Sequence, residues 1–264
     1  MQPSPVKQAL GEGRAVIGTM LGEMTSPGTC RIVKEAGYDF VIFDTEHHWP
    51  GVETVARLLR SARDIGLQAY VRAPGFRGQW PARYLDLGAA GLIFPHVDSG
   101  EQCAEIVAQV KFPPVGKRGL GTNIAHDDYH AQPAAEFTTE ANTRTLVAVQ
   151  IETAAGLEAR EEIMGVPGVD AVFIGPNDLS LSLGLPGQLD HPTVVQSIED
   201  IFASAAAAGV APGMHVFDMA SALKSLDAGC RFWNFRSEVS FFVGGSRDAL
   251  AEIRAHPSVS EGVY

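Results

Sequence analysis

The sequence predicts an α/β protein of the (β/α)8 class, the TIM barrel. Three observations lead there. Short continuous apolar runs alternate with segments of helical periodicity, a glycine recurs where a helix ends and an apolar run begins, and 264 residues accommodate eight such units. An open doubly wound sheet has the same alternation, so the sequence by itself does not establish that the sheet closes.

The expected strands are eight apolar runs bounded by turn residues. Continuous apolar character suits parallel strands that are buried on both faces. In chain order they are a run near 15–21, FVIF (40–43), QAYVR (68–72), GLIF (91–94), LVAVQI (146–151), AVFI (171–174), the run that ends in His215 and the run FWNF (232–235).

The expected helices lie between these runs. Apolar residues at helical spacing mark two of them, at positions 52, 55, 59 and 62 and at positions 103, 106, 107 and 110. Junctions such as EAGYDFVIFD, DIGLQAYVR and GVPGVDAVFIG place a glycine after each helix. Glycine reaches the left-handed conformation that closes a helix at little cost.

We expect one domain over residues 1–264, interrupted by an irregular loop at about 112–143. That segment is rich in turn residues and polar side chains and lacks sustained periodicity. Long irregular loops in compact domains are usually functional or mobile. The loop is therefore where substrate specificity is expected.

The amino-acid composition argues against some partners and indicates where the protein is located. The chain has 31 acidic and 20 basic side chains, a formal charge of -11, which repels nucleic acid. No stretch approaches the roughly 18 apolar residues of a membrane helix, and three widely spaced cysteines do not suggest a disulfide framework. We expect a cytoplasmic protein with no nucleic-acid or membrane partner.

Polar residues close most of the expected strands. Because barrel enzymes carry their chemistry at the carboxyl ends of strands, these residues are the site candidates. They are Asp44, Glu46, His47, His48, Arg72, His96, Gln150, Glu152, Asn177, Asp178, His215, Asn234 and Arg236. Taken singly, each is as readily explained by helix capping or a solvated loop.

Glu152 and Asp178 are the expected metal ligands. They follow consecutive strands, which lie about 4.8 Å apart, so their carboxylates can meet on one ion. Oxygen ligands without cysteine suit Mg²⁺ or Mn²⁺. Gln150 lies on the same side of its strand as Glu152 and is expected to contact the substrate or steady that ligand.

Arg72, His47 and Asp44 are the expected catalytic groups. The fork of Arg72 could bind a carboxylate or a developing oxyanion bidentately, although a salt bridge is an equal alternative. The adjacent imidazoles of His47 and His48 are candidates for proton transfer, the usual catalytic task of histidine, and Asp44 could orient His47. For His96 and His215 a structural role is the more common one.

Two kinds of chemistry are disfavoured. The five lysines, at positions 7, 34, 111, 117 and 224, all fall outside the expected strands, so a Schiff-base lysine has no candidate. The sequence contains no GxxxxGK[ST] loop and no GxGxxG after a strand. We therefore expect no nucleotide cofactor.

Six motifs in order, VIFDTEHHWPG, YVRAPG, YLDLGAAGLIFPHVDS, GKRGLG, VQIETAAGLE and GVDAVFIGPNDLSLSLG, resemble those of the HpcH/HpaI family of metal-dependent 2-oxo acid aldolases. The resemblance runs from about residue 15 to 187. It implies a barrel of the phosphoenolpyruvate/pyruvate superfamily type that forms homo-oligomers, commonly hexamers. It also implies a class II aldolase that uses Mg²⁺, Mn²⁺ or Co²⁺ to cleave a 4-hydroxy-2-oxo acid reversibly into pyruvate and an aldehyde through a metal-stabilised enolate.

The resemblance also implies residue roles. Glu152 and Asp178 become the metal ligands, His47 the general base and Arg72 the stabiliser of the transition state. Gln150 and Asn177 become substrate contacts. Asp86 becomes an acidic partner that raises the basicity of the histidine, whereas from the sequence alone it looks like an exposed residue near a helix end.

Departures from the family pattern leave the substrate open. The bulky segment His47-His48-Trp49-Pro50 stands where family members frequently have small residues, and Asn123-Ile124-Ala125-His126 stands where they often have an arginine. Pyruvate recognition therefore looks intact and the aldehyde pocket remodelled. The alternatives are an oxaloacetate decarboxylase or related enolate-forming lyase on the same site, and a non-catalytic barrel that binds an oxo acid.

Overall fold

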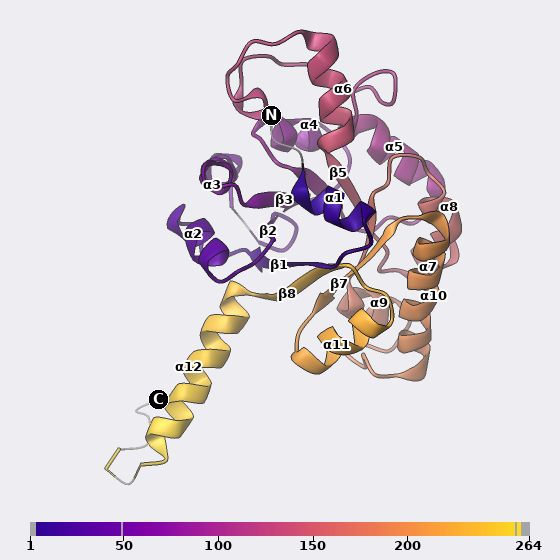
Figure 1. The fold of residues 1–264 in the computed structure, drawn as a ribbon. Helices are drawn as coiled ribbons and strands as arrows, with labels where there is room; N and C mark the ends of the chain where they lie inside the picture. The colour runs from indigo at the N-terminus through magenta and orange to yellow at the C-terminus, as the bar shows by residue number, and fades with distance from the viewer. Residues whose placement is uncertain (1–3, 49, 257, 260–264) are drawn as a thin grey trace.

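Eight parallel strands close into a barrel in the computed structural model, which describes residues 4–48, 50–256 and 258–259 (Figure 1). Each strand pairs with the next along the chain, and β8 pairs with β1, so the sheet closes and the open alternative is excluded. The strands are β1 (Val16–Leu21), β2 (Phe40–Asp44), β3 (Gln68–Arg72), β4 (Gly91–Phe94), β5 (Leu146–Gln150), β6 (Ala171–Ile174), β7 (Ala211–Val216) and β8 (Phe232–Ser237). All eight expected runs are confirmed.

Helices surround the barrel. They are α1 (Pro5–Gly11), α2 (Gly28–Glu35), α3 (Val52–Asp64), α4 (Trp80–Asp86), α5 (Gly100–Val110), the 3-10 helix η1 (Ala125–Asp127), α6 (Ala134–Arg144), α7 (Ala154–Glu158), α8 (Arg160–Met164), α9 (Pro176–Ser182), α10 (Pro192–Ala208), α11 (Met219–Asp227) and α12 (Glu238–Arg254). None of the described helices is long and apolar enough to span a bilayer.

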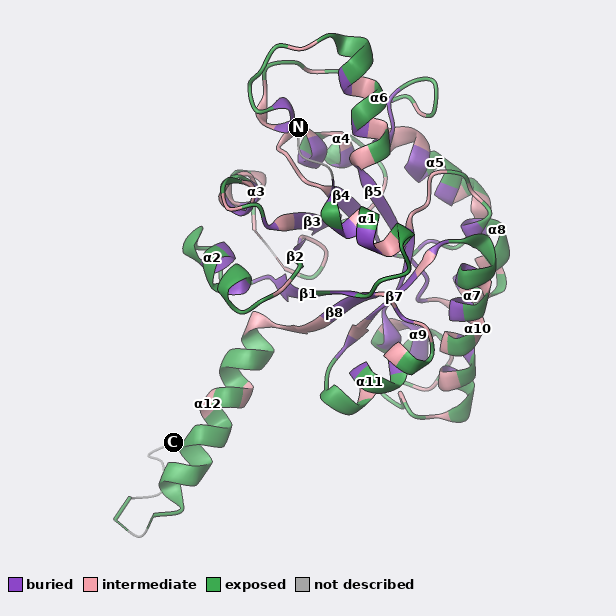
Figure 2. Cartoon of the chain, viewed as in Figure 1, coloured by how far each residue is buried: buried purple, intermediate pink, exposed green. Residues whose placement is uncertain are grey.

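The barrel interior is packed with aromatic side chains. The ring of Phe40 stacks on Phe232 with centroids 4.7 Å apart, and Tyr70 meets both rings edge-on. Gly18 provides the room, because a side chain there would collide with the Phe40 ring. The burial pattern in Figure 2 follows from this packing: the strands are buried and the helices are exposed on their outer faces. The interior is thus filled, and chemistry is confined to the ends of the barrel.

The segment 112–143 is not irregular throughout, because α6 occupies its last third. This helix was hard to predict because it buries only Phe137 and Ala141, which form a small apolar cluster with Phe112. The segment connects the end of α5 to the start of β5, so it lies at the amino ends of the strands. Within one chain this is the end opposite the predicted site.

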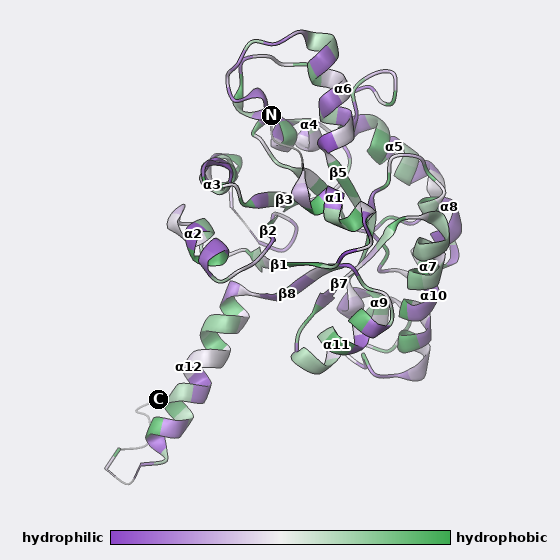
Figure 3. Cartoon of the chain, in the orientation of Figure 1, coloured by the Kyte–Doolittle hydropathy of each residue, from purple (hydrophilic) through white to green (hydrophobic). Residues whose placement is uncertain are grey.

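Helix α12 projects away from the barrel in Figure 1, and none of its residues, all of which are described, is buried. Its hydropathy colouring in Figure 3 alternates between apolar and polar stretches. Large apolar side chains on it are exposed, among them Phe242 at 65% and Ile253 at 57%. In a closed barrel the final helix would ordinarily cover the sheet, whereas here none of the described residues covers this apolar surface.

Candidate active site

The carboxyl end of the barrel gathers most of the predicted residues. Asp44 and Arg72 are register partners at the last positions of β2 and β3. Gln150 ends β5 and Glu152 follows two residues later, while Asp178 lies in the first turn of α9, directly after β6. Because parallel strands end on the same side of a barrel, these side chains converge.

Arg72 and Asp44 form a buried bidentate pair. Arg72 Nε lies 2.7 Å from Asp44 Oδ1, and Arg72 Nη2 lies 2.7 Å from Asp44 Oδ2. Burial alone would raise the pKa of Asp44, but the hydrogen bonds and charge of Arg72, with a contribution from His48, lower it to about 2. Of the two alternatives for Arg72, the structure shows the salt bridge: Asp44 occupies the fork, and Arg72 Nη1 lies 3.1 Å from Glu46 Oε2.

His48, rather than His47, is the histidine that Asp44 orients. His48 Nδ1 lies 2.6 Å from Asp44 Oδ2, and its ring lies against Gly22, where a side chain would collide with it. His47 is 55% exposed, and its Nε2 lies 3.9 Å from Glu46 Oε2. The predicted Asp44–His47 contact is replaced because the chain turns after β2 and presents the second imidazole to Asp44. Trp49 of this segment lies outside the described residues.

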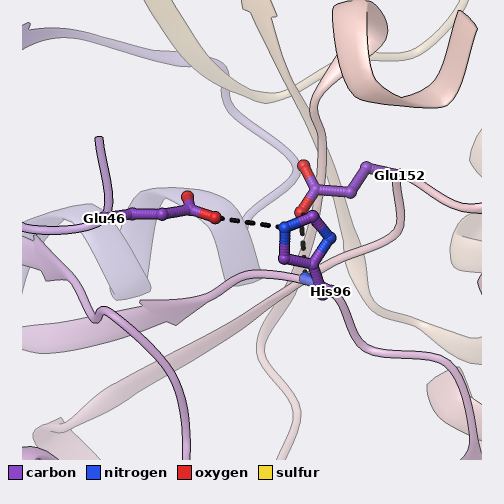
Figure 4. A group of neighbouring side chains, drawn as sticks. All are labelled: Glu46, His96 and Glu152. Carbon is purple, nitrogen blue, oxygen red and sulfur yellow. Dashed lines mark hydrogen bonds and ion pairs between the residues drawn. The ribbon is translucent and has the colours of Figure 1, made fainter. Parts of the chain in front are cut away.

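Glu46, His96 and Glu152 form a compact cluster (Figure 4). His96 Nε2 lies 3.3 Å from Glu46 Oε1, and His96 Nδ1 lies 3.3 Å from Glu152 Oε1. The backbone N–H of His96 also donates to Glu152 Oε1, at 2.9 Å. One ligand atom from each residue lies within 4.8 Å of the others, so the three could hold a metal ion.

The electrostatics of the cluster favour a cation. Burial raises the pKa of Glu46, and the nearby charges of Asp44 and Asp178 raise it further. Burial likewise raises the pKa of Glu152, to which Glu46 contributes repulsion. The charge of Asp178 thus reaches Glu46, although Asp178, a predicted metal ligand, is not one of the three residues that form the cluster. The carboxylates of Asp44, Glu46 and Glu152 share the positive charge of the Arg72 guanidinium, and a bound divalent cation would relieve their repulsion.

Gln150 and His215 line the inner side of the candidate site. The side-chain amide of Gln150 donates to Glu152 Oε2, and its Oε1 is buried with no hydrogen-bond partner among the described residues. Such an orphaned acceptor suits a substrate hydroxyl or a bound water. Burial and the charge of Arg72 lower the pKa of His215 to about 4, so this imidazole is neutral near pH 7. Asn177, at the start of α9, is exposed.

Asp86 lies at the other end of the barrel. It is the last residue of α4, which leads toward the start of β4. Its Oδ1 lies 2.6 Å from Arg118 Nη2 and 3.5 Å from His126 Nδ1. Within one chain Asp86 therefore supports the amino end of the barrel, and its partner there is His126 rather than the expected histidine.

Sequence reasoning undervalued Glu46 and His96. Glu46 was present among the residues after β2, but no spacing rule distinguished it from its neighbours. His96 is among the site candidates of the sequence, but a structural role is the more common one for such a histidine. The available signal was its place: it follows β4 by two residues, next to the strand that carries Glu152.

A parallel eight-stranded barrel with buried carboxylates, an imidazole and an arginine at its carboxyl end defines an α/β-barrel enzyme with a potential metal site. A family model described as HpcH/HpaI aldolase/citrate lyase matches residues 22–244. This chain belongs to the HpcH/HpaI aldolase/citrate lyase family, which confirms the resemblance in its motifs.

Relatives agree with this assignment. The chain is 32% identical to a hydroxypyruvate/pyruvate aldolase of Cupriavidus necator over 255 residues, 97% of this chain and 94% of the relative. It is 33% identical to a 2-keto-3-deoxy-L-rhamnonate aldolase of Salmonella gallinarum over 264 aligned positions, 97% of this chain and 96% of the relative. A crystal structure of an HpcH/HpaI aldolase from Desulfitobacterium hafniense matches with a TM-score of 0.93 at 32% identity, over 97% of this chain and 98% of that chain.

Proposed function

We propose that this protein is a divalent-metal-dependent class II aldolase that reversibly cleaves a 4-hydroxy-2-oxo acid into pyruvate and an aldehyde. The observation that carries the proposal is the cluster of buried carboxylates around His96, beside Arg72, at the carboxyl end of the barrel. The names of its aldolase relatives support the reaction class. The barrel is proposed to be of the phosphoenolpyruvate/pyruvate superfamily type, in a single domain.

Glu152 and Asp178 are proposed to hold the metal, with Glu46 beside them. The ligands contribute oxygen atoms, which suit Mg²⁺, Mn²⁺ or Co²⁺. When bound, the cation would supply a fixed positive charge opposite the substrate oxygen on which negative charge develops as the C3–C4 bond breaks. Gln150, through its orphaned Oε1, and Asn177 are proposed to position the substrate.

Arg72 is proposed to stabilise the negative charge that develops on the substrate, and His47 is proposed to transfer the proton. Asp44 fixes the Arg72 guanidinium at the wall of the site, so that its Nη1 edge, which lies beside Glu46, can stabilise a developing oxyanion. His47, exposed at the mouth, would accept the proton of the 4-hydroxyl as the aldehyde leaves and return it in the synthetic direction. Neutral His215 adds no competing proton near pH 7.

The reaction is tested by pyruvate release from a panel of 4-hydroxy-2-oxo acids, with oxaloacetate alongside. Chelation is expected to abolish release, and Mn²⁺, Co²⁺ or Mg²⁺ to restore it. Full activity in excess chelator would sink the proposal. Turnover of oxaloacetate alone would favour the decarboxylase alternative, and the same panel of aldehydes offered with pyruvate would define the electrophile.

A homo-oligomer is proposed as the working form, with α12 packed on a second copy of the chain. The uncovered apolar residues of α12 support this. Phe242→Asp is expected to reduce the mass measured by light scattering after size-exclusion chromatography. Leu223→Asp, which replaces an exposed apolar residue of α11 (54% exposed, against 65% for Phe242), is the matched control and should leave the mass unchanged.

The proposed role of Asp86 beside His47 also requires a second copy, since the two residues lie at opposite ends of one barrel. Co-expression of Asp86→Asn and Glu152→Gln chains tests it. If Asp86 acts across the interface, mixed oligomers contain sites that are intact and recover part of the wild-type rate. Mixed oligomers as inactive as either parent would show that Asp86 does not act in this way.

A cytoplasmic location is proposed as well. Cys30, Cys103 and Cys230 are buried and free, and burial raises the pKa of each thiol. Unpaired buried thiols fit a reducing compartment.

A further inference from the structure

We propose that His96 binds the divalent cation directly through one imidazole nitrogen, and that this nitrogen makes the site prefer Co²⁺ over Mg²⁺. The inference rests on the proposed metal-dependent function and adds a ligand to it. It concerns a residue whose own sequence context favours a structural role, and it is carried by three observations: the position of the ring, the conformation of its backbone and the ligands around it.

The ring lies where a ligand of the shared ion would lie. Its two nitrogens are each 3.3 Å from a carboxylate oxygen, Nε2 from Glu46 and Nδ1 from Glu152, and Figure 4 shows the ring between the two acids. Adjacent ligands of an octahedral ion with bonds of about 2.1 Å are separated by about 3 Å. One nitrogen can therefore bind the ion while the other donates to a carboxylate, the usual arrangement of a ligating histidine.

The backbone of His96 is held in a left-handed conformation, with φ of 52°. Residues other than glycine adopt this backbone conformation at some cost in free energy, and residues in such conformations concentrate at functional sites. Three hydrogen bonds impose it here: His96 N–H to Glu152 Oε1 at 2.9 Å, Val97 N–H to the Gln150 carbonyl at 3.1 Å, and Gln102 Nε2 to the His96 carbonyl at 2.8 Å. The strand that carries the metal ligand thus also fixes the imidazole.

The ring is free to serve as a ligand. Its side chain is 54% exposed, so the strained backbone does not serve to fill the core, and its contacts with described side chains are with the two acids of the cluster. Imidazole binds the later divalent transition metals more strongly than it binds Mg²⁺, which prefers oxygen. A nitrogen in this ligand set therefore shifts selectivity rather than merely adding affinity.

Metal affinity and pulsed EPR test the inference on the intact protein. Calorimetric titration measures the affinities for Co²⁺ and for Mg²⁺. The metal-free wild type is compared with His96→Gly and His96→Asn. Glycine removes the ring without a backbone penalty, and asparagine tolerates the same conformation while offering an oxygen. We expect His96→Gly to weaken Co²⁺ by roughly 10- to 100-fold, as loss of a supporting ligand does, and Mg²⁺ far less. His96→Asn should retain Mg²⁺ affinity and lose the preference for Co²⁺.

With Mn²⁺ bound, the wild type should show ¹⁴N modulation from a coordinated imidazole. His96→Gly should lose it, and His47→Asn, in the same site, should keep it. Absence of nitrogen coupling in the wild type, an unchanged Co²⁺/Mg²⁺ ratio in His96→Gly, or tighter binding of both metals by that variant would overturn the inference. The last result would mean that the ring occupies the metal site only when the metal is absent.

Failure here can be told apart from failure of the proposed function. If Glu152→Gln abolishes metal binding while His96→Gly changes neither the ratio nor the nitrogen signal, the metal site stands and only the role of His96 is wrong. If Glu152→Gln binds metal as the wild type does, the proposed site itself is wrong.

Discussion

The two ends of the barrel carry the same three kinds of residue in contact. Each has an arginine, an aspartate and a histidine: Arg72, Asp44 and His48 at the carboxyl end, and Arg118, Asp86 and His126 at the amino end. The arginine–aspartate distances are nearly equal, 2.7 Å and 2.6 Å. The difference lies in what surrounds them.

At the amino end Asp86 and Asp128 each have an arginine partner. Arg118 pairs with Asp86 and lies over the Phe112 ring, and Arg63 pairs with Asp128 at 2.7 Å. A cavity of about 320 Å³ opens there, lined by these two arginines and Arg144. At the carboxyl end the carboxylates of Glu46 and Glu152 share Arg72 with Asp44, and the charge of Asp178 acts on Glu46 as well. An arginine–aspartate pair therefore does not identify a site; an excess of buried negative charge beside it does.

The largest expected effect on activity comes from removing one of the excess carboxylates at the carboxyl end. Glu152→Gln is nearly isosteric and deletes one charge, so it should lose the metal and slow pyruvate release by more than the roughly 100-fold typical of groups around a metal site. Activity assays at saturating Mn²⁺ measure this. A rate of pyruvate release within tenfold of the wild-type rate would contradict the assignment of Glu152 to the metal site.

Next in size is the loss of the buried pair. Arg72→Met leaves Asp44, which is fully buried, without its bidentate partner, at a cost of about 3–5 kcal/mol in the free energy of unfolding. The turnover number should fall by about 10²–10³ because a charge facing the oxyanion is gone. Urea denaturation and steady-state kinetics measure the two effects. Arg118→Met, the amino-end counterpart, should also cost stability but leave Mn²⁺ affinity unchanged; a loss of metal there would contradict the assignment of the site.

The pH dependence of stability should report the half-buried imidazole of His215. Its folded pKa of about 4 is below the ordinary value of 6.5, so the unfolded chain binds the extra proton between these values. Stability from this residue is complete above about pH 6.5 and is lost as the pH falls toward 4, by about 3 kcal/mol. Urea denaturation at several pH values should show a shallower loss in His215→Gln. If stability falls with pH equally in the wild type and in His215→Gln, the imidazole of His215 does not cause the loss.

Asp86→Asn should have the smallest effect on stability, about 1–2 kcal/mol. Asp86 is one-third exposed, at 33%, and asparagine keeps an acceptor for Arg118. Mn²⁺ affinity, followed by titration, should not change. Weakened metal binding in this variant would mean that the two ends of the barrel are not independent within a chain.

The fold could be predicted almost completely from the sequence, because each strand of a parallel barrel is a local apolar run between turn residues. The convergence of Asp44, Arg72, Gln150 and Glu152 followed from strand ends alone. Closure could not be predicted, since the β1–β8 pairing joins residues at opposite ends of the chain.

The rest of the site depends on loop conformation, which local patterns do not fix. The turn after β2 decides that His48 rather than His47 meets Asp44. The left-handed backbone at His96 decides that its ring reaches two acids. For Asp86, the end of α4 lies at the amino end of its own barrel, so the role implied by the family resemblance depends on a second copy of the chain, which local patterns do not describe.

Calorimetric titration of Mn²⁺ into metal-free wild type, Glu152→Gln and Asp86→Asn tests most directly whether the unbalanced carboxylates form the metal site. The account predicts one strong site per chain in the wild type and in Asp86→Asn, and none in Glu152→Gln. Equal binding by all three proteins, or loss in Asp86→Asn alone, would contradict it.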